Sequence, residues 1–551
     1  MAQQPFAAGS PPTPGNPSTQ YVSDSAALNE LITTVVNKFE ASSDSLTIVV
    51  LGSLPLTGNI APINTPGSVI IQATSGSSVS IDGASKYQGF VIMSGTVTIS
   101  NLNINNMVSQ GLQGCLGAGA GVFVGNLSQK EYKTSAAANV TLFNVSFSNC
   151  SAQGGSGTTI SKGGAGGVYQ AGTFEGGFGG AGAEGYKPSG DGLFQSSVTA
   201  GYFGIAGPAG SGGHYGGYDF DATGGQGKAG GDGGYGGSAG CGGSGGGGAG
   251  AIITGGTGGT AGAAGSPGFG GGTGSWAAGQ PPAENNGVGG LGGDSGNSGG
   301  AGLGGAIFVM DNAALLIQGD GSMSGGKAVG GEDVLIPNAL SGALLPAGAG
   351  AGAFLQGAGL LTFAPANNYT VNDMIADETG AVRIGAAGIC PSRTGPDGQE
   401  AGGGTGKWEL AMTGSGTLAL NGSHAFSGPI TVSSGSLDLS AYENGGCCDL
   451  VLSKSPSLIV RPQTAAGTLQ LGNFSVSTGA SLLLNGNSRI VAETLEATFI
   501  ELVLDPTGFT ANEPVPLIQT TQPLPASLGI KLSPGYTSQA GANTIYVTLN
   551  Q

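Results

Sequence analysis

Charged residues are scarce in this chain, and basic residues are the scarcest. The 551 residues include 15 Lys and Arg against 32 Asp and Glu, a net charge of −17 at pH 7. All four arginines (Arg383, Arg393, Arg461 and Arg489) follow residue 380, and no three basic residues are consecutive. Binding to nucleic acid requires clustered cations that neutralise phosphates, so the sequence argues against a nucleic-acid partner. An anionic membrane surface is disfavoured for the same reason.

Long apolar runs are also missing. No run reaches the ~18 residues that a membrane-spanning helix needs, so we expect no direct membrane span in this chain. The first residues, Met1 to Phe6, lack the basic and apolar regions of a secretory signal. They predict either a mature N-terminus with an added Met or export by another route.

Cysteines are too few and too scattered for a disulfide scaffold. The adjacent pair Cys447-Cys448 fits neither a zinc knuckle nor a redox CxxC motif. We therefore interpret the cysteines as stacked or paired core residues. The six are Cys115, Cys150, Cys241, Cys390, Cys447 and Cys448.

Glycine is abundant, with 115 residues, and it recurs in short turns that lead directly into apolar or aromatic residues. Such strands, separated by Gly, Asn and Ser corners with no helix between them, predict a parallel β-solenoid. Hydrophobic residues make up 39% of the chain, which is enough to bury a long core. The four turns are Gly119–Val124, Gly164–Tyr169, Gly304–Val309 and Gly352–Leu355.

One amphipathic helix of about 16 residues is predicted between Ser23 and Phe39, because its apolar residues recur at i, i+3 and i+4. The first coil of a solenoid leaves unpaired backbone groups and an open core, so we interpret the helix as a cap. Strands follow, and Val97–Asn106 alternates cleanly between apolar and polar residues. Its asparagines, Asn101, Asn103, Asn105 and Asn106, suit corners and amide ladders between coils.

Residues 153–303 form a Gly-rich interruption punctuated by aromatic residues. One interpretation is a set of long, loosely ordered loops between coils. The alternative is an ordered projection that presents aromatic rings to a partner, because aromatics give a large contact area at low entropic cost. The candidate partner-binding residues are Tyr202, Phe203, Tyr215, Tyr218, Phe220, Tyr235 and Trp276.

Several stretches carry a resemblance to known families. Ile81-Asp82-Gly83 and the strand pair Val97–Asn106 resemble the opening of right-handed parallel β-helix proteins. Val140–Cys150 and the Gly-Gly-Ala turn at Gly304–Ile307 are similar to repeats of the polymorphic outer-membrane proteins. Gly414–Leu439 resembles the passenger-associated transport repeat of autotransporter adhesins, with His424-Ala425-Phe426 in place of the family's Asn-Thr-Tyr. The C-terminal stretch from Val515 to Leu549 looks like the last coils of an autotransporter passenger.

The predicted fold is thus all-β, a right-handed parallel β-helix (solenoid) with an N-terminal capping helix and a long Gly-rich loop insertion. The expected divisions are a flexible leader at 1–20, a cap helix and first coils at 21–152, the insertion at 153–303, further coils at 304–410, and a transport-repeat and C-terminal region at 411–551.

Motifs for catalysis are weak. The Gly-x-Ser-x-Gly match at Gly242–Gly246 follows from glycine content alone, and His214 and His424 lack a defensible Ser/Asp arrangement, so both are predicted at the surface. Trp408 is interpreted as core. β-Helix folds also carry pectin-cleaving enzymes, which need clustered carboxylates and a nearby basic group. No such constellation is evident, so we expect no enzyme activity, no cofactor and no metal.

The predicted function is that of a secreted or cell-surface β-helix adhesin or aggregation factor. It would lie outside the cell or on the bacterial outer surface, and its partner would be a host or neighbouring-cell surface, or another copy of itself. A self-assembling structural protein that forms extracellular filaments or a surface layer is the alternative. A polysaccharide-processing β-helix enzyme is the third possibility.

Overall fold

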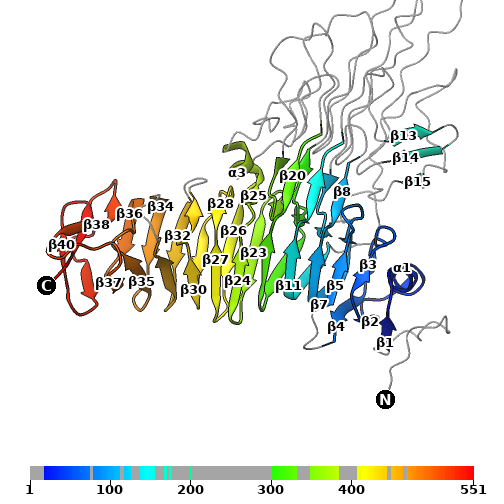
Figure 1. Ribbon diagram of the computed structural model, residues 1–551, viewed down its shortest axis with the longest axis horizontal. Coiled ribbons are helices and arrows are strands. Elements are labelled where there is room, and N and C mark those ends of the chain that lie inside the picture. Colours follow the sequence, from blue (N-terminus) through cyan, green and yellow to red (C-terminus); the bar gives the residue numbers. More distant parts are fainter. Residues whose placement is uncertain are drawn as a thin grey trace, which may run out of the picture.

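The computed structural model describes residues 18–74, 79–111, 117–125, 137–155, 167–170, 173–176, 199–200, 301–331, 348–383, 406–443, 448–462 and 468–550. The chain is nearly all-β and contains a large, nearly closed and mostly parallel sheet, so the predicted all-β class is confirmed. Figure 1 shows the strands side by side along the long axis of the body. They run from β1 and α1 at the N-terminal end to β38 and β40 at the C-terminal end.

A first series of strands, the first ladder, extends over the whole body. Each strand pairs in parallel with the next of the series, as in the register Leu46, Val69, Val97, Val140 and Leu315. Its members are β1 (Ser18–Val22), β2 (Ser45–Val50), β4 (Ser68–Ala73), β7 (Thr96–Asn105), β11 (Asn139–Ser148), β18 (Ala314–Gln318), β23 (Gly359–Ala364), β26 (Trp408–Met412), β29 (Ile430–Val432), β32 (Cys448–Leu452), β34 (Leu469–Val476), β36 (Ile490–Ala497) and β38 (Pro514–Thr520).

A second ladder runs beside the first, and β7 and β11 take part in both. These two strands bend at Asn101 and Asn144, which have φ of 55° and 53°. Asparagine tolerates this left-handed conformation better than most residues. The other members are β3 (Leu54–Pro55), β5 (Val79–Asp82), β19 (Gly321–Ser324), β24 (Asn368–Val371), β27 (Thr417–Leu420), β30 (Ser436–Asp438), β33 (Ser457–Val460), β35 (Ser481–Asn485), β37 (Phe499–Asp505) and β39 (Gly529–Leu532).

The amide ladders predicted at these corners are found for Asn101 and Asn106, whereas Asn105 bonds a hydroxyl. Asn144 Nδ2 donates to Asn101 Oδ1 at 3.0 Å, and Asn149 Nδ2 donates to Asn106 Oδ1 at 3.3 Å. Asn105 Oδ1 accepts from the Ser148 hydroxyl at 2.8 Å. Each corner side chain therefore links one strand layer to the next.

A third ladder of short strands is confined to the N-terminal two thirds of the body. Its strands are buried throughout, whereas strands of the first two ladders alternate between buried and partly exposed residues. The buried residues form one continuous core from Val22 to Val547. The third ladder consists of β6 (Phe90–Ile92), β10 (Val122–Val124), β17 (Ile307–Val309), β22 (Ala353–Leu355) and β25 (Ile375–Asp377).

Helix α1 (Ser25–Thr34) is shorter than predicted and is followed by a 3-10 turn at Val36–Lys38. It lies at the N-terminal end of the body, where Leu28, Leu31 and Ile32 enter the core (Figure 1). Asn29 donates to the Asn59 carbonyl at 2.9 Å and accepts from the Ala61 N–H at 2.7 Å. Its amide therefore satisfies backbone groups much as a neighbouring strand would.

Asn37 repeats this pairing one step further along the same segment. It donates to the Pro62 carbonyl at 2.8 Å and accepts from the Asn64 N–H at 2.9 Å. The helical segment thus covers backbone groups at the end of the body, as a cap does. The boundary predicted for the leader is wrong by three residues, because residues 18–20 belong to β1, which pairs with β2.

The C-terminal end departs from the parallel pattern. β41 (Thr544–Leu549) pairs antiparallel with both β38 and β40 (Tyr536–Ala540). The region expected to form the last coils and cap therefore ends in antiparallel strands. An antiparallel hairpin needs only a short connection and closes the strand series.

Candidate functional site

The seven aromatic residues proposed as a partner-binding surface, Tyr202, Phe203, Tyr215, Tyr218, Phe220, Tyr235 and Trp276, lie outside the described residues. The structure does describe where the 153–303 insertion joins the body. The candidate site is therefore built from those attachment points.

The insertion joins the body between two short parallel ladders. One consists of β8 (Val108–Gln110), β12 (Ser151–Gln153) and β20 (Lys327–Val329). The other consists of β9 (Gly117–Ala118), β16 (Gly302–Leu303) and β21 (Gly348–Ala349). We call these two ladders the crossing edge. Because β12 includes Gln153 and β16 includes Gly302 and Leu303, these predicted boundary residues belong to the body.

Three connections cross at this edge in equivalent positions. The chain passes from β8 to β9, from β12 to β16 and from β20 to β21. Gln110, Gln153 and Val329, which end the first set of strands, share one register. Gly117, Gly302 and Gly348, which begin the second set, share another. The Gly-rich insertion is therefore the longest of three connections built on the same plan.

Glycine is required where the two short ladders approach each other. A Cβ on Gly117 would lie 2.0 Å from the Gln153 carbonyl oxygen, and one on Gly302 would lie 2.0 Å from that of Val329. A Cβ on Gly348 would meet the Ala328 carbonyl oxygen at 2.1 Å. These distances exclude any larger residue without a shift of the backbone, which explains the recurrence of glycine here.

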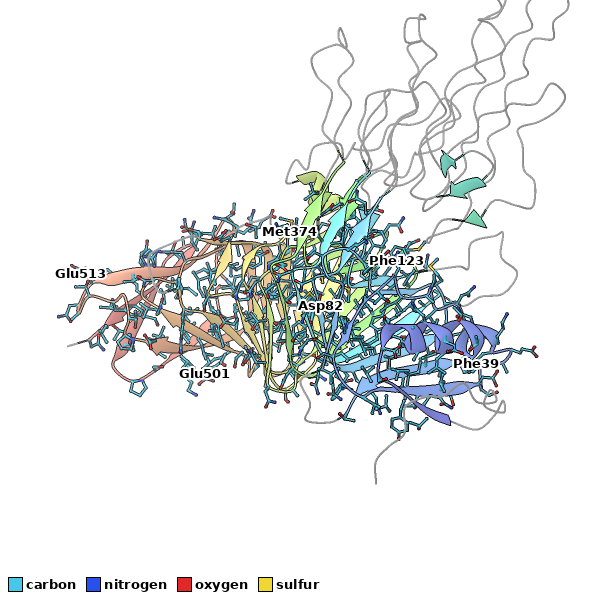
Figure 2. The ribbon with its side chains drawn as sticks, turned by 45° about the vertical axis from the view of Figure 1, so that its right-hand side comes forward. Phe39, Asp82, Phe123, Met374, Glu501 and Glu513 are labelled. Carbon is cyan, nitrogen blue, oxygen red and sulfur yellow. The ribbon has the colours of Figure 1, made fainter. Side chains whose placement is uncertain are left out.

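The turns that follow are the Gly-apolar turns singled out in the sequence. Gly119 and Gly304, which begin two of these turns, and Gly350, two residues before the turn at Gly352, have φ of 55°, 69° and 68°, and each is followed by a strand of the third ladder. Beneath them the rings of Phe123, Phe308 and Phe354 stack, with centroids 5.1 Å and 5.7 Å apart. Figure 2 shows Phe123 within the body and Met374 nearer the upper edge of the view.

The fourth turn of that set behaves differently. Within the Gly164–Tyr169 stretch, the described residues belong to β13 (Gly167–Gln170), which pairs antiparallel with β14 (Thr173–Gly176). The prediction that this turn joins the same parallel series is therefore wrong. β14 also pairs in parallel with β15 (Thr199–Ala200), so these three strands form a small sheet of their own.

A buried carboxylate, missed in the sequence, anchors the chain at the end of the third ladder. Asp377 is 0% exposed, ends β25 and directly precedes α3 (Glu378–Arg383). Its Oδ1 accepts from the Gly380 N–H at 2.6 Å. Its Oδ2 accepts from the Trp408 N–H at 3.0 Å and from the N–H and hydroxyl of Ser427, both at 2.8 Å. The carboxylate thus joins three segments through four hydrogen bonds.

Glu378 makes a second junction beside it. Its two oxygens accept from the N–H groups of Gly357 at 3.1 Å and Gly406 at 3.0 Å. Burial is the main cause that raises the pKa of Glu378 above its usual range, and the nearby Asp311 and Asp377 act in the same direction. In the sequence, two adjacent acids directly after the apolar Ile375-Ala376 are the pattern that could have drawn attention to both residues. Their geometry is that of backbone anchors.

His424 is buried, so the prediction that places it at the surface is wrong. Its Nδ1 accepts from the Ile375 N–H at 3.1 Å, which requires that nitrogen to be unprotonated. Nε2 therefore carries the proton and donates it to the Asn421 carbonyl at 3.1 Å. Burial is the main cause that lowers the pKa of His424 to about 4. Both ring nitrogens are occupied, which suits a structural role.

The other sequence candidates fall into the core. Trp408 is 1% exposed, as predicted, and its Nε1 donates to the Gln356 carbonyl at 2.9 Å. Cys150 is buried, and burial raises the pKa of its thiol to about 12, which leaves little reactive thiolate. Cys448 is also buried. Cys115, Cys241, Cys390, Cys447 and His214 lie outside the described residues.

Within the described ranges, no three His, Cys, Asp or Glu side chains gather in a group that could hold a metal ion. In that same part of the chain, no helix combines the length and apolarity needed to cross a bilayer. Neither a family model, nor a characterised protein, nor a solved structure matches this chain.

Proposed function

We propose that this chain is a right-handed parallel β-helix of the autotransporter-passenger type that acts as a surface-exposed or secreted adhesin or aggregation factor. The body serves as a stiff support, and the 153–303 insertion is the surface presented to a host or neighbouring cell. Parallel strands stacked about 4.8 Å apart would make a rod of this kind resistant to bending.

The observation that carries the proposal is the crossing edge. Three equivalent connections leave the body there, and the longest lies between Gln153 and Gly302. A rigid scaffold that positions long connections along one edge is a common way to build a recognition surface. The core continues beneath this edge through the stacked rings of Phe123 and Phe308, so the body packs continuously across the point where the insertion joins it.

The self-assembling filament receives less support from the ends of the body. Stacking of copies end to end requires open strand edges. Here α1 covers some of the backbone groups at one end through Asn29 and Asn37, and the other end finishes in the antiparallel strands β40 and β41, which break the parallel register that stacked copies would continue.

The polysaccharide-processing enzyme is likewise less supported. The oxygens of Asp377 and Glu378, the buried neighbouring carboxylates, already accept backbone hydrogen bonds. A general acid or base needs an oxygen within reach of the substrate.

Deletion of residues 156–298 tests the proposal. Replacing them with a linker as long as the β8–β9 connection should preserve the far-UV circular dichroism of the body and abolish adhesion to cells or cell aggregation. Replacement of 332–347, the β20–β21 connection at the same edge, is the matched control and should retain more of the activity. Full adhesion by the first variant would contradict the proposal, as would activity on uronate polymers that survives both deletions.

A narrower variant tests the aromatic residues themselves. Replacing Tyr215, Tyr218 and Trp276 together by Ser should weaken adhesion at least about tenfold, because aromatic side chains dominate the energy of recognition surfaces. Unchanged adhesion would remove these residues from the proposal while leaving the insertion in it.

A further inference from the structure

The outward side of the first ladder carries an unusual share of exposed apolar residues. Among the described residues, four large hydrophobic residues are exposed to solvent over more than a third of their surface. They are Ile70 at 39%, Phe143 at 36%, Val329 at 50% and Leu360 at 51%. Three of them, Ile70, Phe143 and Leu360, lie on β4, β11 and β23 of the first ladder. We call the outward side chains of this ladder from β2 to β23 the methyl face.

The central row of the methyl face consists of side chains that each end in a methyl group. The residues share one register across the strands and are partly or largely exposed. The strands of the first ladder from β1 to β23 contain no charged residue, even at their exposed positions. The row consists of Thr47, Ile70, Thr98, Thr141, Leu316 and Thr362.

The second ladder differs in the same layers of the body. Its outward row is made of short polar side chains, of which only Thr370 ends in a methyl group. The hydroxyls of Ser53 and Ser146 accept backbone N–H groups of the next strand. The contrast shows that the methyl face does not follow from the fold alone. The polar row consists of Ser80, Asn103, Ser146, Ser322 and Thr370.

We propose that the methyl face binds the methyl face of a second copy of this chain, giving a side-by-side dimer. Two copies that each carry a net charge of −17 repel each other. They can approach most easily through a surface that opposes no carboxylates, and this face is free of charge over all six of its strands. The pairing does not depend on the insertion or on its proposed adhesive role.

The size of the face suits a weak dimer. Six strands spaced about 4.8 Å apart, with about five residues of about 3.3 Å each, give a flat area of roughly 480 Å² per copy. Two copies would bury roughly 950 Å², which is close to the lower limit for a specific interface and typical of a weak one. Apolar contact over this area, with threonine methyls between the larger side chains, resembles the packing of two sheets face to face.

The positions of the exposed residues favour an antiparallel arrangement. Phe143 lies on β11, and both β4 with Ile70 and β23 with Leu360 are two strands away from it on opposite sides. A twofold axis through β11 would place Phe143 of one copy against that of the other. The same axis would bring Ile70 over β23, which carries Thr362 and Leu360. The face is therefore self-complementary, as a twofold interface must be.

Sedimentation of the full chain over a range of protein concentrations tests the dimer. We expect a monomer–dimer equilibrium that tightens as sodium chloride is added, because salt screens the repulsion between the copies. Thr362→Glu should raise the dissociation constant by more than about tenfold, because its carboxylate would be buried without a partner against Ile70 of the other copy. The matched control, Thr370→Glu on β24 of the second ladder, should leave it within about twofold.

Crosslinking provides a second, independent measurement. Phe143→Cys should give a covalent dimer with a short bismaleimide, because the two positions would face each other across the axis, and Thr370→Cys should not exceed the background of the unmodified chain. Circular dichroism establishes that each variant is folded, and Phe143→Ser replaces Thr362→Glu if the latter is not. A chain that stays monomeric at all concentrations overturns the proposal and leaves the face to another occupant. Equal dissociation by the two glutamate variants also overturns it.

Discussion

The ring of Phe123 stacks on the ring of Phe308 with centroids 5.1 Å apart and planes within 2° of parallel, although the whole Gly-rich insertion separates them in sequence. Their strands, β10 and β17, pair residue for residue. The strands that come before and after the insertion therefore pack directly against each other in the body.

Phe308→Ala should destabilise the body by about 3–5 kcal/mol, the usual loss when a buried phenylalanine leaves a cavity. Phe308 is 0% exposed and lies between Phe123 and Phe354. Val329→Ala, at an exposed position outside the methyl face, is the control and should cost less than about 1 kcal/mol. Chemical denaturation followed by circular dichroism measures both. Equal losses of unfolding free energy in the two variants would mean that the buried aromatic stack does not stabilise the body.

Asp377→Asn should destabilise the body by about 2–4 kcal/mol. The amide group would place an N–H donor where the carboxylate accepts from the N–H groups of Trp408 and Ser427, so buried donors would lose their partner. Glu409→Gln, at an exposed position next to Trp408, should change stability by less than about 0.5 kcal/mol. Comparable midpoints in urea for the two variants would show that Asp377 is not an anchor.

Gly302→Ala should destabilise the crossing edge, because its Cβ would lie 2.0 Å from the Val329 carbonyl oxygen and 2.6 Å from that of Ala152. The backbone must shift, and we expect a loss of about 2 kcal/mol or more. A Cβ on Gly52 meets nothing within 4 Å, so Gly52→Ala should be neutral within about 1 kcal/mol. Thermal unfolding of the two variants measures the difference. A Gly302→Ala protein as stable as the Gly52→Ala protein would refute the close approach.

His424 should make the body less stable as the pH falls from about 6.5 to about 4. Its folded-state pKa of about 4 lies below the usual 6.5, so the unfolded chain takes up the proton first. The stabilisation is complete above pH 6.5 and is lost as the pH falls through the folded-state pKa. The difference between the two pKa values corresponds to a loss of unfolding free energy on the order of 3 kcal/mol.

The His424→Gln variant separates this contribution from others. Asp373 and Glu378 have pKa values raised mainly by burial, and they act in the opposite sense, because their contribution is lost as the pH rises. The His424→Gln variant should therefore not become less stable between pH 6.5 and pH 4. The loss of stability with rising pH that comes from Asp373 and Glu378 should remain. An unchanged decline, measured as the free energy of unfolding in urea, would contradict the assignment to His424.

The local features of the ladders could be predicted because they depend on neighbouring residues. The alternation in Val97–Asn106 predicts which side chains point inward, and Val97, Ile99, Leu102 and Ile104 are all buried. Asn101 and Asn106 were expected at corners, where their φ values are 55° and 52°. The glycine turns before β10, β17 and β22 follow the same logic of local backbone conformation.

The environment of single polar residues could not be predicted in this way. His424 looks like a surface residue in sequence, but Ile375, which donates to its ring, is 49 positions away. Asp377 binds Ser427, which is 50 positions away. Burial and hydrogen bonding at these positions depend on which strand lies in the next layer.

By itself, the sequence determined the all-β class, the scarcity of charge and the places where the strands turn, because propensity and alternation act within a few residues. Only the tertiary structure decided that three connections share one edge, that His424 is buried and that the chain ends in an antiparallel hairpin. It also decided that Ile70, Phe143 and Leu360 lie on one face. Each of these facts depends on pairing between strands distant in sequence, and the free energy of that pairing is not encoded in any single strand.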